Sequence, residues 1–507
     1  MNPCVSRLTL AVHGSISQIP AAEWDALIAH EPDRASPFAR HAFLAAAEES
    51  GSATPRTGWA PRHLVLRRDG VIRAAAAAYA RVSSEGDFGR DWEWAAAAAR
   101  ARVPYYPKLV LGAPFTPATG RRVLVAPGED RTSMLQALVE GVGRLCQEEG
   151  IHSVHAVYLS PEEARELEGL GLALRVDFQY HWMNEGYRSP EDFLARFSSK
   201  RRNTIRRERS APAVQGIAIR TVRGDELSRD PSGWARDCFA LHRATTDRMA
   251  WGMRFVNRGF YERVIGSMPD AVEVVEARRQ GKIVGMAFNF RSPSVLYGRY
   301  WGCSESHPFL HFNVALYHSI DECIRGGVSR FEGGAGGEHK LARGFQPVET
   351  WSAHLFLERR LDASLRRHLE LERANRLDAV ARGAPPSGRL SLPRRPRTAE
   401  HELRPPQALA SSLASRARSH EGRSLRRPGV GQRPDHGFLK RAGSSASRRA
   451  GKLLASPPAG PEKEPRGGEA GRLGQHGTRR LGRRGEEGAG RRWVAGRRRL
   501  ATRFAVA

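Results

Sequence analysis

Hydrophobic and polar positions follow strand and helix periodicities in the first part of the chain and predict a mixed α/β unit over residues 8–184. The runs 63–68 and 71–81 read as strands and are joined by Asp69-Gly70, a pair that tolerates the positive φ of a tight hairpin turn. The other periodic segments predict helices at residues 92–102, 132–150 and 161–169, and strands at 108–112, 152–159 and 172–183.

A second set of elements follows. Ser189-Pro190-Glu191-Asp192 begins a helix with a capping side chain, a proline whose missing N–H costs nothing there, and two acids at the positive end of the helix dipole. We expect this helix to run on through the basic residues 200–209, and Asn313 to cap a later helix. The pattern then predicts antiparallel strands at 271–278, 283–291 and 295–303, and further elements at 313–325, 328–332, 338–343 and 349–357.

The order of an antiparallel meander, a helix, a strand, a helix and a strand thus occurs twice. We therefore predict a mixed α+β fold with two tandem domains, residues 1–184 and residues 185–375, of which the second is expected to be catalytic. A last helical pattern at 363–380 ends in Pro385-Pro386.

The C-terminal stretch differs from the rest of the chain. Residues 381–507 carry 30 Lys and Arg against 9 Asp and Glu, which is +21 of the total net charge of +27. Leu, Ile, Val and Phe make up only 13% of this stretch, below the roughly 20% that a charged segment needs to fold, so we predict disorder. The tail is typical either of an RNA-binding disordered segment or of a high-GC gene read out of frame, and we favour the frame error.

The net charge is therefore no argument that the folded part binds nucleic acid. No run reaches the ~18 apolar residues of a membrane span, and His13 and Ser15 interrupt the N-terminal apolar stretch too early for a secretory signal, so we expect a cytoplasmic protein. The five cysteines are scattered and have no CxxC spacing, which indicates reduced thiols and no metal site.

The strand at residues 295–303 (VLYGRYWGC) is a candidate part of the site. Gly298 and Gly302 weaken a strand unless something approaches its backbone closely, so a ligand is expected against it. Alternation places Tyr297, Arg299 and Trp301 on one face and Tyr300 on the other. The alternative is that these aromatic residues fill the core.

Residues 331–345 (FEGGAGGEHKLARGF) are the most unusual folded stretch. Backbone amides at Gly334, Gly336 and Gly337 and at the following helix start suit a phosphate or an oxyanion. The loop lacks the Lys-Ser ending of a nucleotide-binding phosphate loop, and glycine-rich loops are also common linkers.

Acid–base chemistry is predicted for Glu332 as base, Tyr300 as acid and His339 beside them, in acyl transfer to an amine. Lys200, Arg201, Arg206, Arg299 and Lys340 are predicted to bind substrate anions. The alternatives are structural ion pairs and, for residues 200–209, a solvated basic helix face. We interpret His311 as structural.

Residues 181–207, 297–313 and 331–345, together with YYPK at 105–108 and PFTPATG at 114–120, resemble the N-acyltransferases related to Fem-type peptidoglycan aminoacyltransferases. The resemblance spans roughly residues 8–375. It implies two packed GNAT-like domains and transfer of an acetyl or aminoacyl group to an amine, on a small molecule or a cell-envelope (peptidoglycan) precursor.

The resemblance also implies a co-substrate, either acyl-CoA or aminoacyl-tRNA, and we expect no metal. The Arg/Gln-x-x-Gly-x-Gly/Ala pyrophosphate loop of acetyl-CoA-binding GNAT enzymes does not follow residues 295–303, whereas the basic helix 200–209 suits tRNA phosphates. The competing hypothesis is a GNAT-like module that has lost catalysis and binds envelope fragments or nucleic acid.

Overall fold

Two β-sheets organise the computed structural model of the chain, which describes residues 8–31, 36–249 and 253–381. A four-stranded sheet has the order β1-β3-β4-β7, and an eleven-stranded sheet has the order β10-β11-β12-β13-β14-β9-β15-β8-β6-β5-β2. The expected mixed α/β class is confirmed. The predicted disordered tail and its frame error lie outside the described residues.

The first half contains, in chain order, β1 (Thr9–His13), α1 (Ala21–Ala29), α2 (His41–Glu49), β2 (Trp59–Pro61), β3 (His63–Arg68), β4 (Val71–Ala76), β5 (Ala78–Arg81), α3 (Trp92–Arg100), β6 (Lys108–Leu111), β7 (Val123–Val125), α4 (Arg131–Glu149), β8 (Ser153–Leu159), α5 (Pro161–Gly169) and β9 (Ala173–Met183). The hairpin at Asp69-Gly70 forms as predicted. The predicted strand 71–81 is in fact two strands, because the chain passes from the small sheet to the large one at Ala77.

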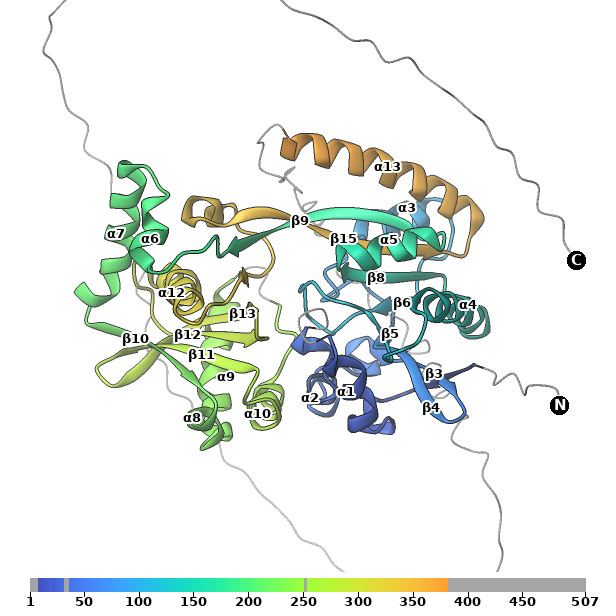
Figure 1. Ribbon diagram of the computed structural model, residues 1–507, viewed down its shortest axis with the longest axis horizontal. Coiled ribbons are helices and arrows are strands. Elements are labelled where there is room, and N and C mark those ends of the chain that lie inside the picture. The colour runs from blue at the N-terminus through green and yellow to red at the C-terminus, as the bar shows by residue number, and fades with distance from the viewer. Residues whose placement is uncertain (1–7, 32–35, 250–252, 382–507) are drawn as a thin grey trace, which may run out of the picture. The chain divides into compact units, whose positions relative to one another are not determined.

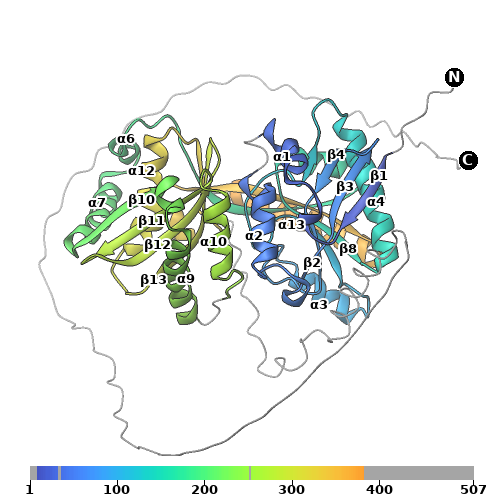
Figure 2. The ribbon, with the colours of Figure 1, turned by 90° about the horizontal axis from the view of Figure 1, so that it is seen from below.

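The second half contains α6 (Pro190–Ala195), α7 (Ser199–Val214), β10 (Ile217–Arg223), α8 (Asp225–Ser228), α9 (Pro231–Arg248), α10 (Arg258–Ser267), β11 (Val272–Arg279), β12 (Lys282–Arg291), β13 (Val295–Cys303), α11 (Leu310–Phe312), the π-helical turn η4 (Asn313–Tyr317), α12 (His318–Arg325), β14 (Arg330–Glu332), η5 (Glu338–Arg343), β15 (Gln346–Phe356) and α13 (Arg359–Ala381). Helix α12 covers one face of β10–β13, and α9 and α10 cover the other (Figures 1 and 2).

Two predicted helix boundaries in this half are wrong. The helix that begins at Pro190 stops at Ala195, because the Ser198 side chain caps a new helix by accepting from the Arg201 N–H and the Arg202 guanidinium donates to the Phe197 carbonyl. Asn313 caps nothing. It lies inside a helix that begins at Leu310, and its Nδ2 donates to the Glu208 and Phe309 carbonyls.

The two halves share their backbone pairing. β9 pairs with β14 through residues 181–183 and with β15 through residues 173–181, and β15 continues onto β8 of the first half (Figure 1). Strands from both sides of residue 184 thus belong to one sheet. The division into domains at that residue stays a prediction.

An aromatic core also joins the halves. The ring centroids of Phe38 and Phe290 are 5.1 Å apart, those of Phe38 and Tyr297 are 5.2 Å apart, and those of Phe43 and Phe260 are 5.6 Å apart, all in edge-to-face geometry. Such pairs add stabilisation to the apolar area that they bury. The walls contributed by the two halves are therefore held in a fixed relation.

Gly302 allows close packing of a helix against β13 and not, as predicted, the approach of a ligand. A Cβ atom there would lie 2.4 Å from the His242 nitrogen and 2.4 Å from the Leu241 carbonyl carbon, both in the backbone of α9. The missing side chain therefore lets a helix, rather than a ligand, approach β13.

We expect Gly302→Ala to lower the free energy of unfolding by about 2 kcal/mol, because backbone must move to admit the methyl group. Urea denaturation followed by circular dichroism measures this. Gly266→Ala is the matched control, since nothing lies within 4 Å of its added Cβ and alanine favours the helix. Equal midpoints for Gly302→Ala and the unmodified chain would contradict the prediction.

Candidate active site

The candidate site begins where two parallel strands separate. β13 and β14 pair only through Val295–Arg330, Leu296–Phe331 and Tyr297–Glu332. β13 then continues to Cys303, whereas the chain after Glu332 turns away into the glycine-rich loop at residues 333–337. Between them lies a cavity of about 420 Å³, lined on one side by residues 298–301 and on the other by residues 333–337. Backbone groups of β13 that have no partner on β14 border this opening.

A β-bulge shapes the β13 wall. Phe288 pairs with Tyr300 and Asn289 pairs with Gly298, so Arg299 has no partner on β12. The extra residue reverses the alternation of side chains. Tyr297 and Tyr300 therefore pack against the same core, while Trp301 packs on the opposite side. The prediction that Tyr297, Arg299 and Trp301 share one face is wrong for this reason.

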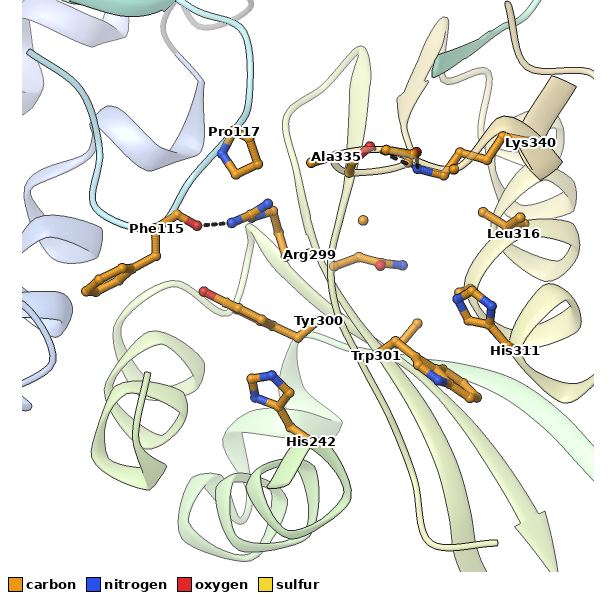
Figure 3. A pocket seen from close by; sticks show the side chains of 18 of the residues that line it. Phe115, Pro117, His242, Arg299, Tyr300, Trp301, His311, Leu316, Ala335 and Lys340 are labelled. Carbon is orange, nitrogen blue, oxygen red and sulfur yellow. Dashed lines mark hydrogen bonds between the residues drawn. The ribbon is translucent and has the colours of Figure 1, made fainter. Parts of the chain in front are cut away.

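The bulge directs Arg299 toward the first half. Its guanidinium donates to the carbonyl of Phe115, as the dashed line in Figure 3 shows, and Pro117 of the same loop lies beside it. Tyr300 points its hydroxyl to that side as well, with His242 below its ring, whereas Trp301 and His311 lie on the other side of the strand. Both halves of the chain thus contribute to the cavity wall.

Lys340 organises the glycine-rich loop. Its Nζ donates to the carbonyl oxygens of Gly334 at 2.9 Å and Gly336 at 2.8 Å, and burial lowers its pKa to about 8. Gly334, Gly336 and Gly337 have φ of 77°, 71° and 94°, which glycine adopts without steric cost. In the described part of the chain, no hydrogen bond uses the amides of residues 335–337 as donors. These amides are thus not committed to protein acceptors, which is compatible with the predicted oxyanion site.

Burial determines the protonation states of the titratable side chains of the cavity. Burial, reinforced by the charges of His339, Lys340 and Arg343, lowers the pKa of His311 to about 4. Burial and the charge of Lys340 also lower the pKa of His339, whose ring centroid lies 6.1 Å from that of His311. Burial raises the pKa of the Tyr300 hydroxyl. At neutral pH the site therefore holds neutral imidazoles, which can accept a proton, and a phenol, which can donate one.

Glu332, predicted as the base, lies outside the residues that line the cavity. Its side chain is 2% exposed. One carboxylate oxygen is 3.1 Å from the Arg330 guanidinium, and the other accepts from the Thr119 N–H at 3.2 Å and lies 4.0 Å from His181 Nε2. The carboxylate thus connects β14 to the first-half loop that carries Phe115.

The predicted anion-binding residues fall into two groups. The cavity is lined by Arg299, Gly334, Gly336, Gly337 and Lys340, together with Tyr300 and His339. Lys200, Arg201 and Arg206 lie on α7, outside the cavity. Arg201 Nε donates to the Ala342 carbonyl of η5 at 2.5 Å, so the basic helix borders the far end of the glycine-rich loop.

Sequence reasoning missed an aromatic wall and one histidine. Phe88, Phe115 and Phe255 line the cavity, and the rings of Phe115 and Phe255 stack at 5.4 Å. His242 contacts the Tyr300 ring and hydrogen-bonds to the Tyr261 hydroxyl through Nδ1 at 2.9 Å. Only Phe115 had a signal, as part of PFTPATG. His242 occupies an ordinary helix position.

Two further findings concern the described residues as a set. They contain no group of three or more His, Cys, Asp or Glu side chains suited to hold a metal ion. None of their helices combines the length and hydrophobicity that a bilayer-spanning segment requires.

We expect Lys340→Met to release the glycine-rich loop, because the Gly334 and Gly336 carbonyls lose their shared donor. Hydrogen–deuterium exchange of peptides covering residues 331–345 should become at least tenfold faster than in the unmodified protein. Lys200→Met removes an exposed lysine of α7 and serves as the control. Unchanged exchange in Lys340→Met would show that the loop is held by other contacts.

Comparison with known proteins identifies the family. The model of the FemAB-like family, described as peptidoglycan biosynthesis/recognition, matches residues 15–384. No curated protein matches the chain. Among solved structures, the chain is similar to FemX, with 12% identity over 69% of this chain and 98% of FemX and a TM-score of 0.44.

It is also similar to a tandem GNAT protein from the clavulanic acid biosynthesis pathway, with 12% identity, 69% and 98% of the two chains covered, and a TM-score of 0.36. A GCN5-related N-acetyltransferase from Kribbella flavida shows 12% identity, coverage of 69% and 71%, and a TM-score of 0.33. The expected Fem-like family is confirmed, whereas the group that is transferred stays a prediction. Since the family model matches most of the chain, the protein belongs to the FemAB-like family of transferases.

Proposed function

We propose that the cavity between β13 and the glycine-rich loop transfers an acyl or aminoacyl group to a primary amine. The observation that carries this proposal is the separation of β13 from β14 at Gly298, which opens a cavity bordered by unpaired main chain and by proton-transferring side chains. Main-chain N–H groups aimed at a carbonyl stabilise the negative charge that its oxygen gains during attack.

The reaction forms a C–N bond and breaks the C–O or C–S bond of the donor. The acceptor amine loses a proton to a neutral imidazole, and the leaving oxygen or sulfur takes a proton from the Tyr300 hydroxyl. The imidazolium then returns its proton to the phenolate through solvent, so the side chains are regenerated. Of the two neighbouring imidazoles we assign the base to His339. His311, with its pKa near 4, is the weaker proton acceptor.

Glu332 has a positioning role in this proposal. Its carboxylate already accepts from the Thr119 N–H and is paired with Arg330, and it lies outside the cavity. It acts by holding the 113–120 loop against β14, and thereby Phe115 against Arg299.

We favour aminoacyl-tRNA as the donor and acyl-CoA as the second candidate. Lys200 and Arg206 are exposed on α7, which contacts η5 through Arg201, so a polyanion lying on this helix reaches the glycine-rich loop. The segment between β13 and α11 has no glycine-rich pyrophosphate motif. The family description, peptidoglycan biosynthesis/recognition, supports a peptidoglycan precursor as the molecule that carries the acceptor amine in this proposal, and we place the reaction in the cytoplasm.

Transfer is tested directly with the full chain, a labelled aminoacyl-tRNA or a labelled acyl-CoA, and an amine-bearing peptidoglycan precursor. We expect label to move from aminoacyl-tRNA to the acceptor nitrogen. Replacing Lys200 and Arg206 together by serine should lower kcat/KM for aminoacyl-tRNA at least tenfold, because phosphate contacts are lost. The exposed Arg236→Ser is the matched control.

Movement of label only from acyl-CoA would identify that donor instead. Movement from neither donor would contradict the proposal and favour a protein that recognises envelope fragments without catalysis.

The assignment of the base is tested by single-turnover rates. We expect His339→Asn to lower the rate about 100-fold or more, the usual size of a general-base contribution, and Glu332→Gln to lower it less than tenfold. His307→Asn, which changes a histidine that does not line the cavity, is the control. A larger loss in Glu332→Gln than in His339→Asn would return the base to Glu332.

A further inference from the structure

The cavity is lined by positive charge without a compensating acid. Its wall contains the cations Arg299 and Lys340 beside three histidines that are neutral at neutral pH, and no aspartate or glutamate is among the described residues that line it. A charged group in a partly dehydrated cavity is costly unless it is paired or hydrogen-bonded. The composition of the wall therefore indicates that part of the occupant is anionic.

Lys340 is already satisfied by the loop. Two of its three donors are used by the Gly334 and Gly336 carbonyls, which fixes the ammonium against the main chain. The positive charge of Lys340 raises the electrostatic potential in the cavity, but its ammonium is held by the loop carbonyls and is not free to turn toward a ligand.

Arg299 is in a different position. Its guanidinium donates to the Phe115 carbonyl, and no carboxylate in the described residues lies within ion-pair distance of it. Its Nε is shielded from solvent and has no hydrogen-bond partner in the described structure. The Phe38 ring, centred 5.7 Å from the guanidinium carbon, stabilises the cation without using its N–H donors. Tyr300 contacts the cation through its ring, at 5.5 Å, and also through a side-chain hydrogen bond. A fixed guanidinium with unused donors matches the bidentate geometry of an oxyanion.

The position of Arg299 indicates which substrate carries the anion. Arg299 faces the first-half loop of Phe115 and Pro117 (Figure 3), whereas α7 borders η5 through the hydrogen bond of Arg201 to the Ala342 carbonyl. In the proposed function the donor occupies the α7 side. An anion at Arg299 therefore belongs to the acceptor.

We propose that Arg299 binds an oxyanion of the acceptor, so that the accepted substrates are amines that also carry a carboxylate or a phosphate. This inference rests on the proposed function in taking the cavity as the place of transfer. The Phe115 carbonyl and the Tyr300 hydroxyl hold part of the guanidinium, and the unpartnered Nε–H is left for the oxyanion together with the N–H groups that these two partners do not use. Amines without such a group lack this anchor and bind more weakly.

Binding of two probes tests the site without any turnover. Glutarate represents the carboxylate source and inorganic phosphate the phosphate source, and each is titrated into the full chain by calorimetry. We expect the unmodified protein to bind at least one probe, and Arg299→Met to weaken that binding at least tenfold, because a charge-assisted bidentate pair is lost. Arg299→Lys should weaken it at least fivefold, since an ammonium cannot hold Phe115 and an oxyanion in the same geometry.

Arg236→Met, which removes an exposed arginine of α9, is the matched control and should bind as the unmodified protein does. Melting temperatures report whether the variants fold. If Arg299→Met does not fold, the probe affinity of Arg299→Lys alone tests the anion site. The tighter of the two probes identifies the source of the anion.

Absence of binding by the unmodified protein, or equal binding by both folded Arg299 variants, would overturn the inference. Its failure is distinguishable from failure of the proposed function. Probe binding that depends on Arg299 supports the anion site even if no label is transferred, and transfer without such binding leaves only the function standing.

Discussion

The site depends on the way in which its two halves are fastened together. β9 pairs with β14 on one edge and with β15 on the other, so main-chain hydrogen bonds cross the boundary between the halves in both directions. The edge-to-face contacts of Phe38 with Phe290 and Tyr297 fill the space beside these strands. Because both connections are buried and directional, the Phe115 loop and the β13 bulge keep a fixed distance. A cavity whose walls come from distant parts of the sequence needs this rigidity.

The chemistry available in the cavity depends on which of its side chains carry a charge. Hydrophobic surroundings keep the histidines neutral and the Tyr300 hydroxyl protonated, while the two cations are held by carbonyl oxygens rather than by carboxylates. A carboxylate that has ion-pair and main-chain partners, such as Glu332, is suited to fastening loops. At the cavity wall, the Nε of Arg299 has no hydrogen-bond partner in the described structure.

Local rules predicted much of the fold. The Asp69-Gly70 turn, the Ser189 cap and the three-stranded meander are set by neighbouring residues and were found as expected. The bulge at Arg299 has no such signal in VLYGRYWGC, because only the pairing with β12 reveals the extra residue. The position of Glu332 outside the cavity and the aromatic wall of Phe88 and Phe255 depend on contacts between segments far apart in sequence. The Gly-rich loop was predicted as an anion site, yet the use of Lys340 to hold it was not.

The pairing of β15 with β8 has a consequence for how the chain is made. Residues 346–356 occupy the edge of β8 and complete the sheet of the first half, although they are synthesised almost two hundred residues later. Until they leave the ribosome, β8 has an open edge that any other strand can occupy. A protein cut near residue 184 would lack the strand that lies between β8 and β9, so these two strands of the first half would not be joined and β8 would keep an open edge.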